Sequence, residues 1–432
     1  MATRKCERLS CALAFAGALT FASAAVRAGG YDTPMLYSAR HIGMGGTAIS
    51  YVNDGSALFH NPAGLGNVQR LSLIADFSLL LAKTHASPDV LSKDRDSELT
   101  VAPLFLLGAG YRVSRLVTLG FGLYPVASAG ATYKYPVGSN TAENKTHLVF
   151  LEASPGIAVN LTPQVRLGLG YRVTYVSLER FQGVPGSTIP PGLDFKMTGT
   201  NFLGARVGLQ WAPLPWLQLG TTYRHRTKTT VTNDQGIALQ RTYSDIETSF
   251  VLPSKLGAGA RADWQAWGFA VDGEYIFGHQ NGAYPLTGVP PADPGATPMR
   301  AAVPNVFNWR DAFTLRTGVE YRLLPTPSGV RPFALRGGYI FDGKITNERY
   351  PSAFGTPPAP THVFTAGAGY SVGAWQFNVA YAHRRGAGQV RPEDIDPASP
   401  GQQPCAFCGA AGNDDYRLRI NGFYADVSWA FN

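Results

Sequence analysis

The sequence lacks the apolar run that a membrane-spanning helix needs. After the first 28 residues no stretch approaches the roughly 20 continuous apolar residues of such a helix, and the mean hydropathy of the chain is −0.06. No Pro- or Ser-rich linker divides the 432 residues, although this length allows two or three soluble domains. These absences argue against a helical membrane protein and against a string of soluble domains.

Charge and cysteine are also scarce. The net charge is +8, and part of this excess lies in the first 28 residues. The remaining basic residues are dispersed, whereas a nucleic-acid-binding face needs them clustered, so we expect no nucleic-acid partner. The excess would attract anionic lipid headgroups or carboxylate ligands, or it is ordinary loop and lumen charge.

Only two cysteines, Cys405 and Cys408, follow the first 28 residues. A zinc site would need a second cysteine pair or nearby histidines, so we expect no metal and no cofactor. A small disulfide in an exported loop is the favoured interpretation. A catalytic redox pair is the alternative.

The N-terminal residues predict an export signal. Arg4, Lys5 and Arg8 precede an apolar stretch, and Val26-Arg27-Ala28 offers small residues for cleavage. We expect residues 1–28 to be removed.

Apolar and polar residues alternate over segments of about ten residues. Val165–Tyr175 carries apolar side chains at odd positions and arginine, glycine or threonine at even ones, and Phe313–Leu323 repeats the pattern. Soluble strands also alternate, but they average about 5 to 6 residues, whereas a tilted membrane strand needs about 9 to 11. The alternation therefore predicts membrane strands with one lipid face and one lumen face.

The connections between these segments are long and short in turn, which is typical of an outer-membrane barrel with outer loops and inner turns. Seven long and six short connections imply fourteen antiparallel strands, an all-β transmembrane barrel over residues 71–432. The long connections are Ala82–Glu98, Ala131–Lys145, Gln182–Asp194, Val231–Pro253, Gly278–Arg310, Gly343–Pro360 and Arg385–Tyr416, and the short ones are Ser114–Arg115, Thr162–Pro163, Pro213–Pro215, Gln265–Ala266, Leu324–Val330 and Gly373.

Residues Ser38–Leu65 carry a family resemblance. Gly45 and Gly46, then Asp54, then Asn61-Pro62-Ala63 resemble the N-terminal hatch of the FadL/TodX family of outer-membrane channels for long-chain fatty acids and other hydrophobic compounds. An Asn before Pro favours an extended or turn backbone, which suits the step from a plug to the first strand. The resemblance implies a hatch over residues 29–70 that fills the barrel lumen.

The third strand continues the resemblance. Gly120, Phe121, Gly122 and Pro125 are similar to the family's third strand, in which an inward kink opens a gap in the wall. Glycine weakens a strand and proline removes a donor, so a break here is also physically plausible. In the family's proposed route a hydrophobic molecule enters from the outer loops, binds in the lumen and leaves sideways through this gap.

This resemblance implies a passive channel for long-chain fatty acids or aromatic and aliphatic hydrocarbons in the bacterial outer membrane, without enzymatic activity. The implied partners are the hydrophobic molecule, outer-membrane lipid and lipopolysaccharide, and the barrel assembly machinery, with the protein a monomer. The chain departs from many such barrels by ending on Asn432 after Phe431.

Several residues are candidates to bind a ligand. Arginines with lumen-facing parity would hold a carboxylate, and Arg180 is favoured because Glu179-Arg180-Phe181 also resembles the end of the family's fifth strand; alternatively, these arginines pair with lumen carboxylates. Residues of the mature N-terminus would close the site from below, or simply pack within the hatch. The candidates are Arg166, Arg172, Arg180, Tyr31, Met35 and Leu36.

Three other functions stay open. A barrel that acts as a scaffold for protein export or surface attachment would share the hatch but have a filled lumen. A lipid hydrolase would need a serine or cysteine beside a histidine; His225, His279 and His383 lie near strand ends without convincing partner spacing. A general diffusion porin would lack the hatch.

Overall fold

The structure, a computed structural model, describes residues 31–32, 36–86, 95–291, 297, 299–323, 332–346, 348–351, 354, 358–394 and 414–431. The predicted export signal, Met35, and both Cys405 and Cys408 lie outside the described residues.

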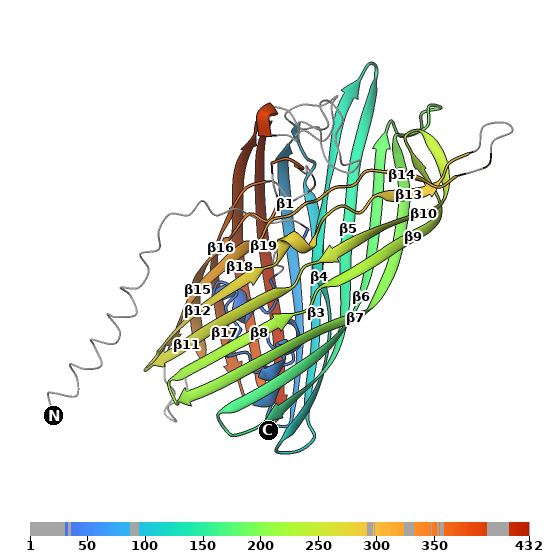
Figure 1. Ribbon diagram of the computed structural model, residues 1–432. Coiled ribbons are helices and arrows are strands. Elements are labelled where there is room, and N and C mark those ends of the chain that lie inside the picture. Colours follow the sequence, from blue (N-terminus) through green and yellow to red (C-terminus); the bar gives the residue numbers. More distant parts are fainter. Residues whose placement is uncertain are drawn as a thin grey trace, which may run out of the picture.

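Fourteen antiparallel wall strands close into a barrel (Figure 1), because the last strand pairs with the first from Leu71–Phe431 to His85–Arg417. Two wall strands are each divided into two segments: one consists of β8 and β9, and the other of β11 and β10. Both β8 and β9 pair with β7, while β11 pairs with β8 and β10 pairs with β9. The predicted fold class is confirmed. The wall strands are β1 (Leu71–Ala86), β3 (Thr100–Arg112), β4 (Val117–Val137), β5 (Asn140–Asn160), β6 (Val165–Gly183), β7 (Leu193–Leu214), β8 (Leu217–Arg224) with β9 (Thr227–Ala238), β10 (Arg241–Leu252) with β11 (Lys255–Trp264), β12 (Trp267–Ile276), β15 (Ala312–Leu323), β16 (Phe333–Asp342), β17 (Thr361–Val372), β18 (Trp375–Val390) and β19 (Asp414–Phe431).

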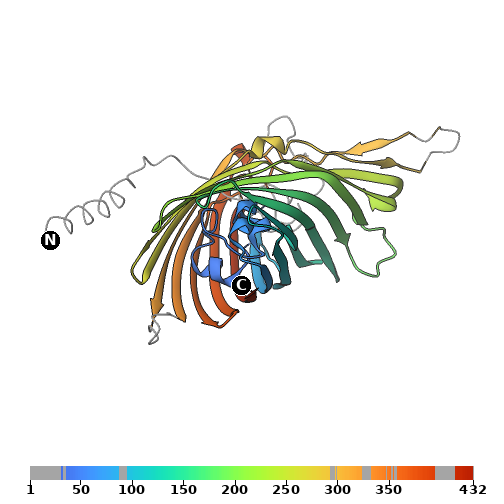
Figure 2. The same cartoon turned by 90° about the horizontal axis from the view of Figure 1, so that it is seen from below.

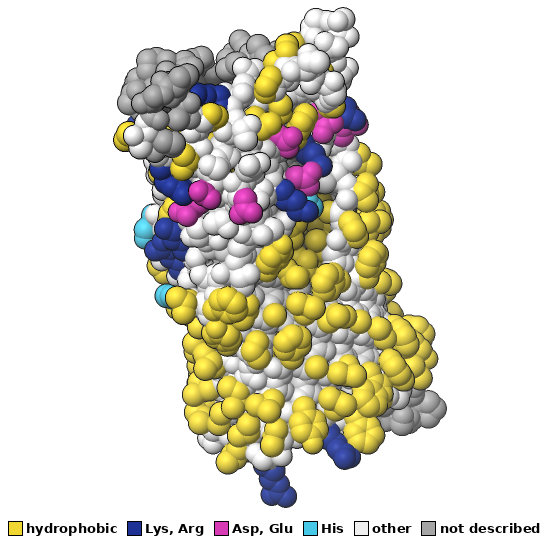
Figure 3. Space-filling model, turned by 90° about the vertical axis from the view of Figure 1, so that its right-hand side faces the viewer, with side chains coloured by type: hydrophobic (Ala, Val, Ile, Leu, Met, Phe, Trp, Pro, Cys, Tyr) yellow, Lys and Arg dark blue, Asp and Glu magenta, His cyan; other side chains and the backbone are white. Residues whose placement is uncertain are grey.

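The alternation read from the sequence sets the two faces of the wall. On β6 the odd positions from Leu167 to Tyr171 are exposed and the even ones are buried. Side chains such as Phe77 and Phe377 are about half exposed, and on the face seen in Figure 3 hydrophobic side chains form a broad belt below a band of charged ones. A belt of this kind is what the hydrocarbon of a bilayer requires.

Two of the predicted long outer loops are instead strand extensions. The segments predicted as loops at 131–145 and 231–253 form hairpins, in which β4 turns into β5 at Gly138-Ser139 and β9 into β10 at Leu239-Gln240. Polar residues dominate both hairpins because the hairpins extend above the apolar belt. The prediction of loops here was wrong because polar residues do not by themselves exclude a strand. Other loops carry short elements: β2 (Arg95–Asp96), η2 (Gly278–Gln280), β13 (Leu286–Val289), β14 (Ala301–Val303) and η3 (Pro392–Asp394).

The described residues before β1 lie inside the barrel. Figure 2 shows this segment, in blue, enclosed by the wall strands. It contains α2 (Ala39–Gly43), α3 (Ala57–His60) and η1 (Pro62–Asn67). Within the described part of the chain, no helix is long and apolar enough to cross a membrane.

Candidate functional site

The Gly45-Gly46 turn lets the hatch backbone touch the wall. Both glycines have positive φ, 67° and 72°, which L side chains rarely adopt. A Cβ on Gly45 would lie 2.3 Å from the Thr317 carbonyl oxygen, and one on Gly338 would lie 2.1 Å from the Gly45 nitrogen. The sequence therefore needs glycine on both sides of this contact.

Asn61 joins the hatch to the opposite wall. Its fully buried amide nitrogen lies 2.7 Å from the Ile49 carbonyl, 3.1 Å from that of Leu209 and 3.2 Å from that of Thr221, so it bonds both hatch and wall. Its side-chain oxygen accepts from the Ala63 amide at 3.1 Å and thereby starts η1 at Pro62. Asn61 of the Asn-Pro-Ala motif thus caps η1 and also anchors it to the wall.

Asp54 and two wall carboxylates complete the anchoring. Asp54 accepts from the Ser56 amide at 2.8 Å and so shapes the turn into α3. Asp272 on β12 accepts from the Ala48 and Ile49 amides at 2.7 and 3.0 Å. Asp426 on β19 accepts from the Ser38 hydroxyl and the Arg40 amide at 3.0 and 3.1 Å.

The hydrogen-bonded ladder between β3 and β4 is interrupted. These strands pair only from Arg112–Thr118 to Leu107–Leu123, whereas β3 continues along β1 to Thr100 and β4 continues along β5 to Val137. Above the interruption, the Glu98 amide donates to the Thr132 carbonyl at 2.7 Å. Residues 99–106 and 124–131 therefore face each other without ladder pairing among the described residues, and we call this unpaired stretch of the wall the window.

A one-residue bulge causes the break. Pro125 pairs with Leu151 and Ala127 pairs with Phe150, so Val126 is the extra residue. A bulge bends its strand, Pro125 lacks an amide donor, and Pro103 on the other edge lacks one too. The prediction that Gly120, Phe121 and Gly122 form the gap is wrong, because all three pair with both neighbours; a Cβ on Gly120 would instead meet Leu65 of the hatch at 2.6 Å.

An apolar cavity of about 110 Å³ lies behind the window. Thr100, Ala102 and Leu104 line it from β3, and Ser128, Ala129 and Gly130 from β4. Small residues at both edges keep this space open. We call it the window cavity.

A second cavity of about 70 Å³ lies deeper in the lumen. Leu36 lines both cavities, so this one side chain forms a shared wall between them. Tyr37, beside Leu36, donates to the Pro125 carbonyl at 2.8 Å and so holds the hatch against the bulge. We call the deeper space the lumen cavity.

Four basic side chains and one acidic side chain line the lumen cavity. Asp32 lies 3.2 Å from Lys255 and also pairs with Arg224, and Glu274 lies 3.4 Å from Arg316. The fourth cation, Arg206, donates to the Leu58 and Phe59 carbonyls and has no carboxylate within 4 Å among the described residues. The cavity therefore carries one cation that is not paired with an acid.

Two histidines of the hatch lie beside this cavity with their rings 5.0 Å apart. Desolvation, followed by the charges of Arg316 and Arg206, lowers the pKa of His60 to about 3. Burial likewise lowers the pKa of His41 well below its usual value, and the charge of His60 adds to this. Both imidazoles are neutral at pH 7.

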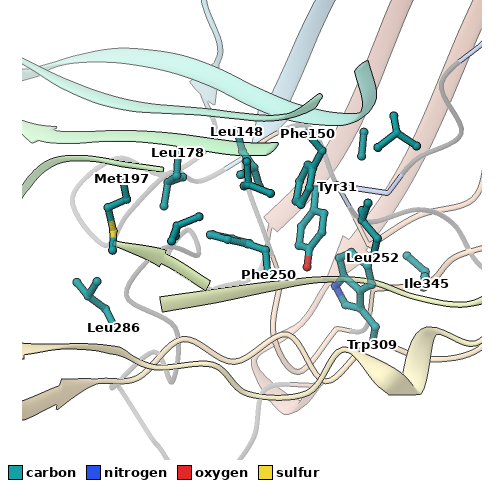
Figure 4. Packing of buried hydrophobic residues seen from close by; sticks show 14 of the residues in the cluster. Tyr31, Leu148, Phe150, Leu178, Met197, Phe250, Leu252, Leu286, Trp309 and Ile345 are labelled. Atoms are coloured by element: carbon teal, nitrogen blue, oxygen red, sulfur yellow. The ribbon is translucent and has the colours of Figure 1, made fainter. Parts of the chain in front are cut away.

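Tyr31 packs at the outer side of the lumen and not below it, contrary to the prediction from the sequence. The Tyr31 hydroxyl donates to the Val251 carbonyl at 2.7 Å, and its ring stacks on Phe150 at 5.3 Å and lies 4.5 Å from Trp309. Figure 4 shows Tyr31 at the centre of this apolar cluster. Asp32, next to it, pairs with the buried Arg224 and Lys255.

The three arginines of β6 do not meet at one site. Arg166 lines the inner mouth, Arg172 is fully buried and pairs with Glu152 at 2.7 Å, and Arg180 lies at the outer end. Arg180 donates to Asn144 and Lys145 and lies over the Phe354 ring. Since they lie on a single extended strand, Arg166 and Arg180 are roughly 46 Å apart at about 3.3 Å per residue.

Sequence reasoning missed Val126, Tyr37, Arg224 and Lys255. Parity marks the last two as lumen-facing, but only the fold brings them to Asp32. The bulge carries no signal except Pro125 itself, since Val126 is an ordinary strand residue.

No protein-family model matches the chain, and a search of curated proteins finds no relative. Among solved structures, the chain is similar to a Pseudomonas aeruginosa FadL homologue, with TM-score 0.69 and 12% identity over 94% of this chain and 100% of that one. It is also similar to the Ralstonia pickettii toluene transporter TbuX, with TM-score 0.63 and 16% identity over 92% and 99%, and to the P. putida toluene transporter TodX, with TM-score 0.63 and 17% identity over 92% and 99%. The chain therefore has the FadL/TodX-type fold, as the hatch residues predicted.

Proposed function

We propose that this protein is an outer-membrane channel that binds a hydrophobic molecule in its lumen and releases it sideways into the bilayer. The observation that carries the proposal is the window, because an apolar cavity lies behind this unpaired stretch of the wall at a place where the hatch fills the axis. The similar structures include proteins described as toluene transporters, which supports a hydrophobic cargo.

The order of the cavities supplies a route. A ligand in the lumen cavity reaches the window cavity by displacing Leu36, and small side chains on both edges leave it room to pass the window. Release into lipid is favourable by about 25 cal/mol per Å² of apolar surface removed from water. Passage therefore needs no energy source within the wall.

Removing the bulge tests the route. Deletion of Val126 would bring Pro125–Leu151 and Ala127–Phe150 into one continuous register while keeping every flanking side chain on its present face. We expect uptake of a hydrophobic probe by vesicles containing the protein to fall at least about tenfold. Val126→Ala, which keeps the bulge, is the matched control. Normal uptake through a regularised wall would refute sideways release.

The lumen cavity favours an amphipathic acid, such as a fatty acid, over a neutral hydrocarbon, because Arg206 forms no ion pair with the residues that the structure describes. Arg206→Gln should weaken binding of an acid by about 1.5 to 3 kcal/mol, the contribution of a charge-assisted hydrogen bond, and should leave a hydrocarbon of equal length nearly unaffected. Equal loss for both would show that Arg206 only supports α3.

Arg180→Gln is the comparison for this experiment. Arg180 was the favoured ligand residue from the sequence, but its contacts are with Asn144, Lys145 and Phe354. We expect it to affect acid and hydrocarbon alike. A selective loss of the acid here would restore Arg180 as the headgroup site.

Hydrolase chemistry has little geometric support. In the described part of the chain, His279 contacts Asp311 at 2.6 Å, His383 contacts Asn421 at 2.9 Å and His225 contacts Tyr223 at 3.5 Å. None of these contacts supplies the serine or cysteine that nucleophilic catalysis needs.

A further inference from the structure

The outer surface carries a row of basic residues across four neighbouring strands. Lys83 on β1 lies directly opposite Arg419 on β19, Arg419 lies opposite Arg385 on β18, and Arg385 lies opposite His362 on β17. Neighbouring side chains of the opposite parity, such as Arg384 and Leu418, line the window cavity. The row therefore points away from the lumen.

The row lies at the upper edge of the apolar belt. On β18 the same outward face carries Trp375, Phe377, Val379 and Tyr381 before it reaches Arg385. Arg385 lies over the outward Phe364 ring at 5.6 Å, and the Tyr339 hydroxyl lies 2.7 Å from the His362 ring. Aromatic side chains of this kind mark the membrane interface, so the row is at the depth of lipid headgroups.

The charges of the two arginines in this row are not neutralised by the residues that the structure describes. Lys83 pairs with Asp96 at 2.7 Å, and in the next row Arg417 pairs with Asp415 at 3.1 Å. Arg385 and Arg419 are exposed and have no acidic partner among the residues that the structure describes. Like charges directly opposite each other destabilise a sheet, so the adjacent Arg385 and Arg419 cost free energy unless an anion lies between them.

We propose that Lys83, Arg385 and Arg419 form a binding site for the phosphate groups of a glycolipid headgroup in the outer leaflet. Guanidinium groups bind phosphate oxygens in pairs, and neighbouring strands lie about 4.8 Å apart, so two arginines and a lysine reach one phosphorylated sugar together. The acyl chains of such a lipid would lie on the belt below. The site depends on the membrane location but not on what the lumen carries.

Native mass spectrometry of the protein with added lipid A tests this site. The wild type should retain diphosphoryl lipid A, and the Arg385→Gln/Arg419→Gln double variant should lose it roughly tenfold or more, because both guanidinium groups that bind the phosphates are then gone. Arg70→Gln/Arg115→Gln, which removes the same charge near the inner end of the barrel, should retain the lipid. Heat-modifiable migration on gels checks that each variant is folded.

Two further arms separate the sources of binding. Lipid A without phosphates should bind the wild type as weakly as diphosphoryl lipid A binds the double variant, and inorganic phosphate should not compete at millimolar concentration, because the acyl chains also contribute. Equal retention of dephosphorylated lipid A, or unchanged retention by the double variant, would overturn the proposal. Uptake of the hydrophobic probe should be the same in the double variant and the wild type.

Discussion

Two places where neighbouring wall strands meet differ in their pairing. We call the fully paired one, between β1 and β19, the closed seam, and the partly paired one, between β3 and β4, the open seam. β1 and β19 come from the two ends of the barrel sequence, yet they pair without interruption from Leu71–Phe431 to His85–Arg417. β3 and β4 are joined by a short turn, yet their pairing stops after Leu107–Leu123. Closeness in sequence therefore does not decide where the wall opens.

The difference lies in what each seam presents to the lumen. The closed seam places Asp76 opposite Asp426, and Asp426 bonds the hatch at Ser38 and Arg40. The open seam has the bulge at Val126 and presents small side chains to an apolar cavity, and Tyr37 of the hatch bonds the bulge carbonyl. One seam is built to hold the hatch, and the other to leave a passage beside it.

Removing the hatch should have the largest effect, because it takes away the contacts with both seams. Deletion of residues 31–67 should turn a closed barrel into an ion-conducting pore, since fourteen strands enclose a lumen too wide for wall side chains to seal. Planar-bilayer recordings would measure a steady conductance absent from the intact protein. An unchanged, closed barrel would show that the outer loops make the seal.

Weakening the closed seam's hold on the hatch should have the next largest effect. Asp426→Ala removes three hydrogen bonds to a buried carboxylate, from Ser38, Arg40 and Asn378, and should lower the free energy of unfolding by about 3 kcal/mol. Transient conductance bursts should accompany the loss. Ser428→Ala, on the same strand, should show neither change.

Lowering the pH should also destabilise the hatch. His60 has a folded-state pKa of about 3. Between pH 6.5 and 3 its imidazole therefore binds a proton in the unfolded chain but stays neutral in the folded hatch. Stability should therefore fall by up to about 1.4 kcal/mol per pH unit as pH drops below about 6.5. His60→Gln should show a shallower slope between pH 6.5 and 4.5 in equilibrium unfolding; equal slopes would mean that other groups dominate.

Removing the hydrogen bond between the hatch and the open seam should have the smallest effect. Tyr37→Phe removes only the bond to the Pro125 carbonyl and should cost about 1 kcal/mol. Because the hatch keeps its anchor at Asp426, we expect altered uptake of a hydrophobic probe without ion conductance. Conductance in this variant would mean that both seams hold the hatch.

The wall could be predicted from the sequence because side-chain parity is a local property. Val165–Tyr175 and Phe313–Leu323 show their two faces in every second residue. The β9–β10 hairpin could not, since its turn uses Leu239 and Gln240 at positive φ, 50° and 61°, without the glycine or asparagine that normally marks such a turn. The β4–β5 hairpin does turn at a glycine, Gly138 with φ 61°, and there the polar composition alone indicated a loop.

The site was predictable only in part. Asn61 was found by resemblance, and its role follows from its buried amide. The window was placed a few residues too early because glycine suggested weak pairing, whereas Gly120 and Gly108 are small to admit Leu65 and Gly55 of the hatch. Arg206 matters because it lines the lumen cavity without an ion pair to any described residue, and no sequence pattern shows that.

Photolabelling in membranes tests the central claim most directly. A hydrophobic probe carrying a diazirine should label residues 100–104 and 128–131 at the window as well as the lumen cavity, and deletion of Val126 should abolish the window label while keeping the one in the lumen. Label that instead follows the barrel axis to the inner mouth near Gly66 and Asn67, in both proteins, would contradict sideways release.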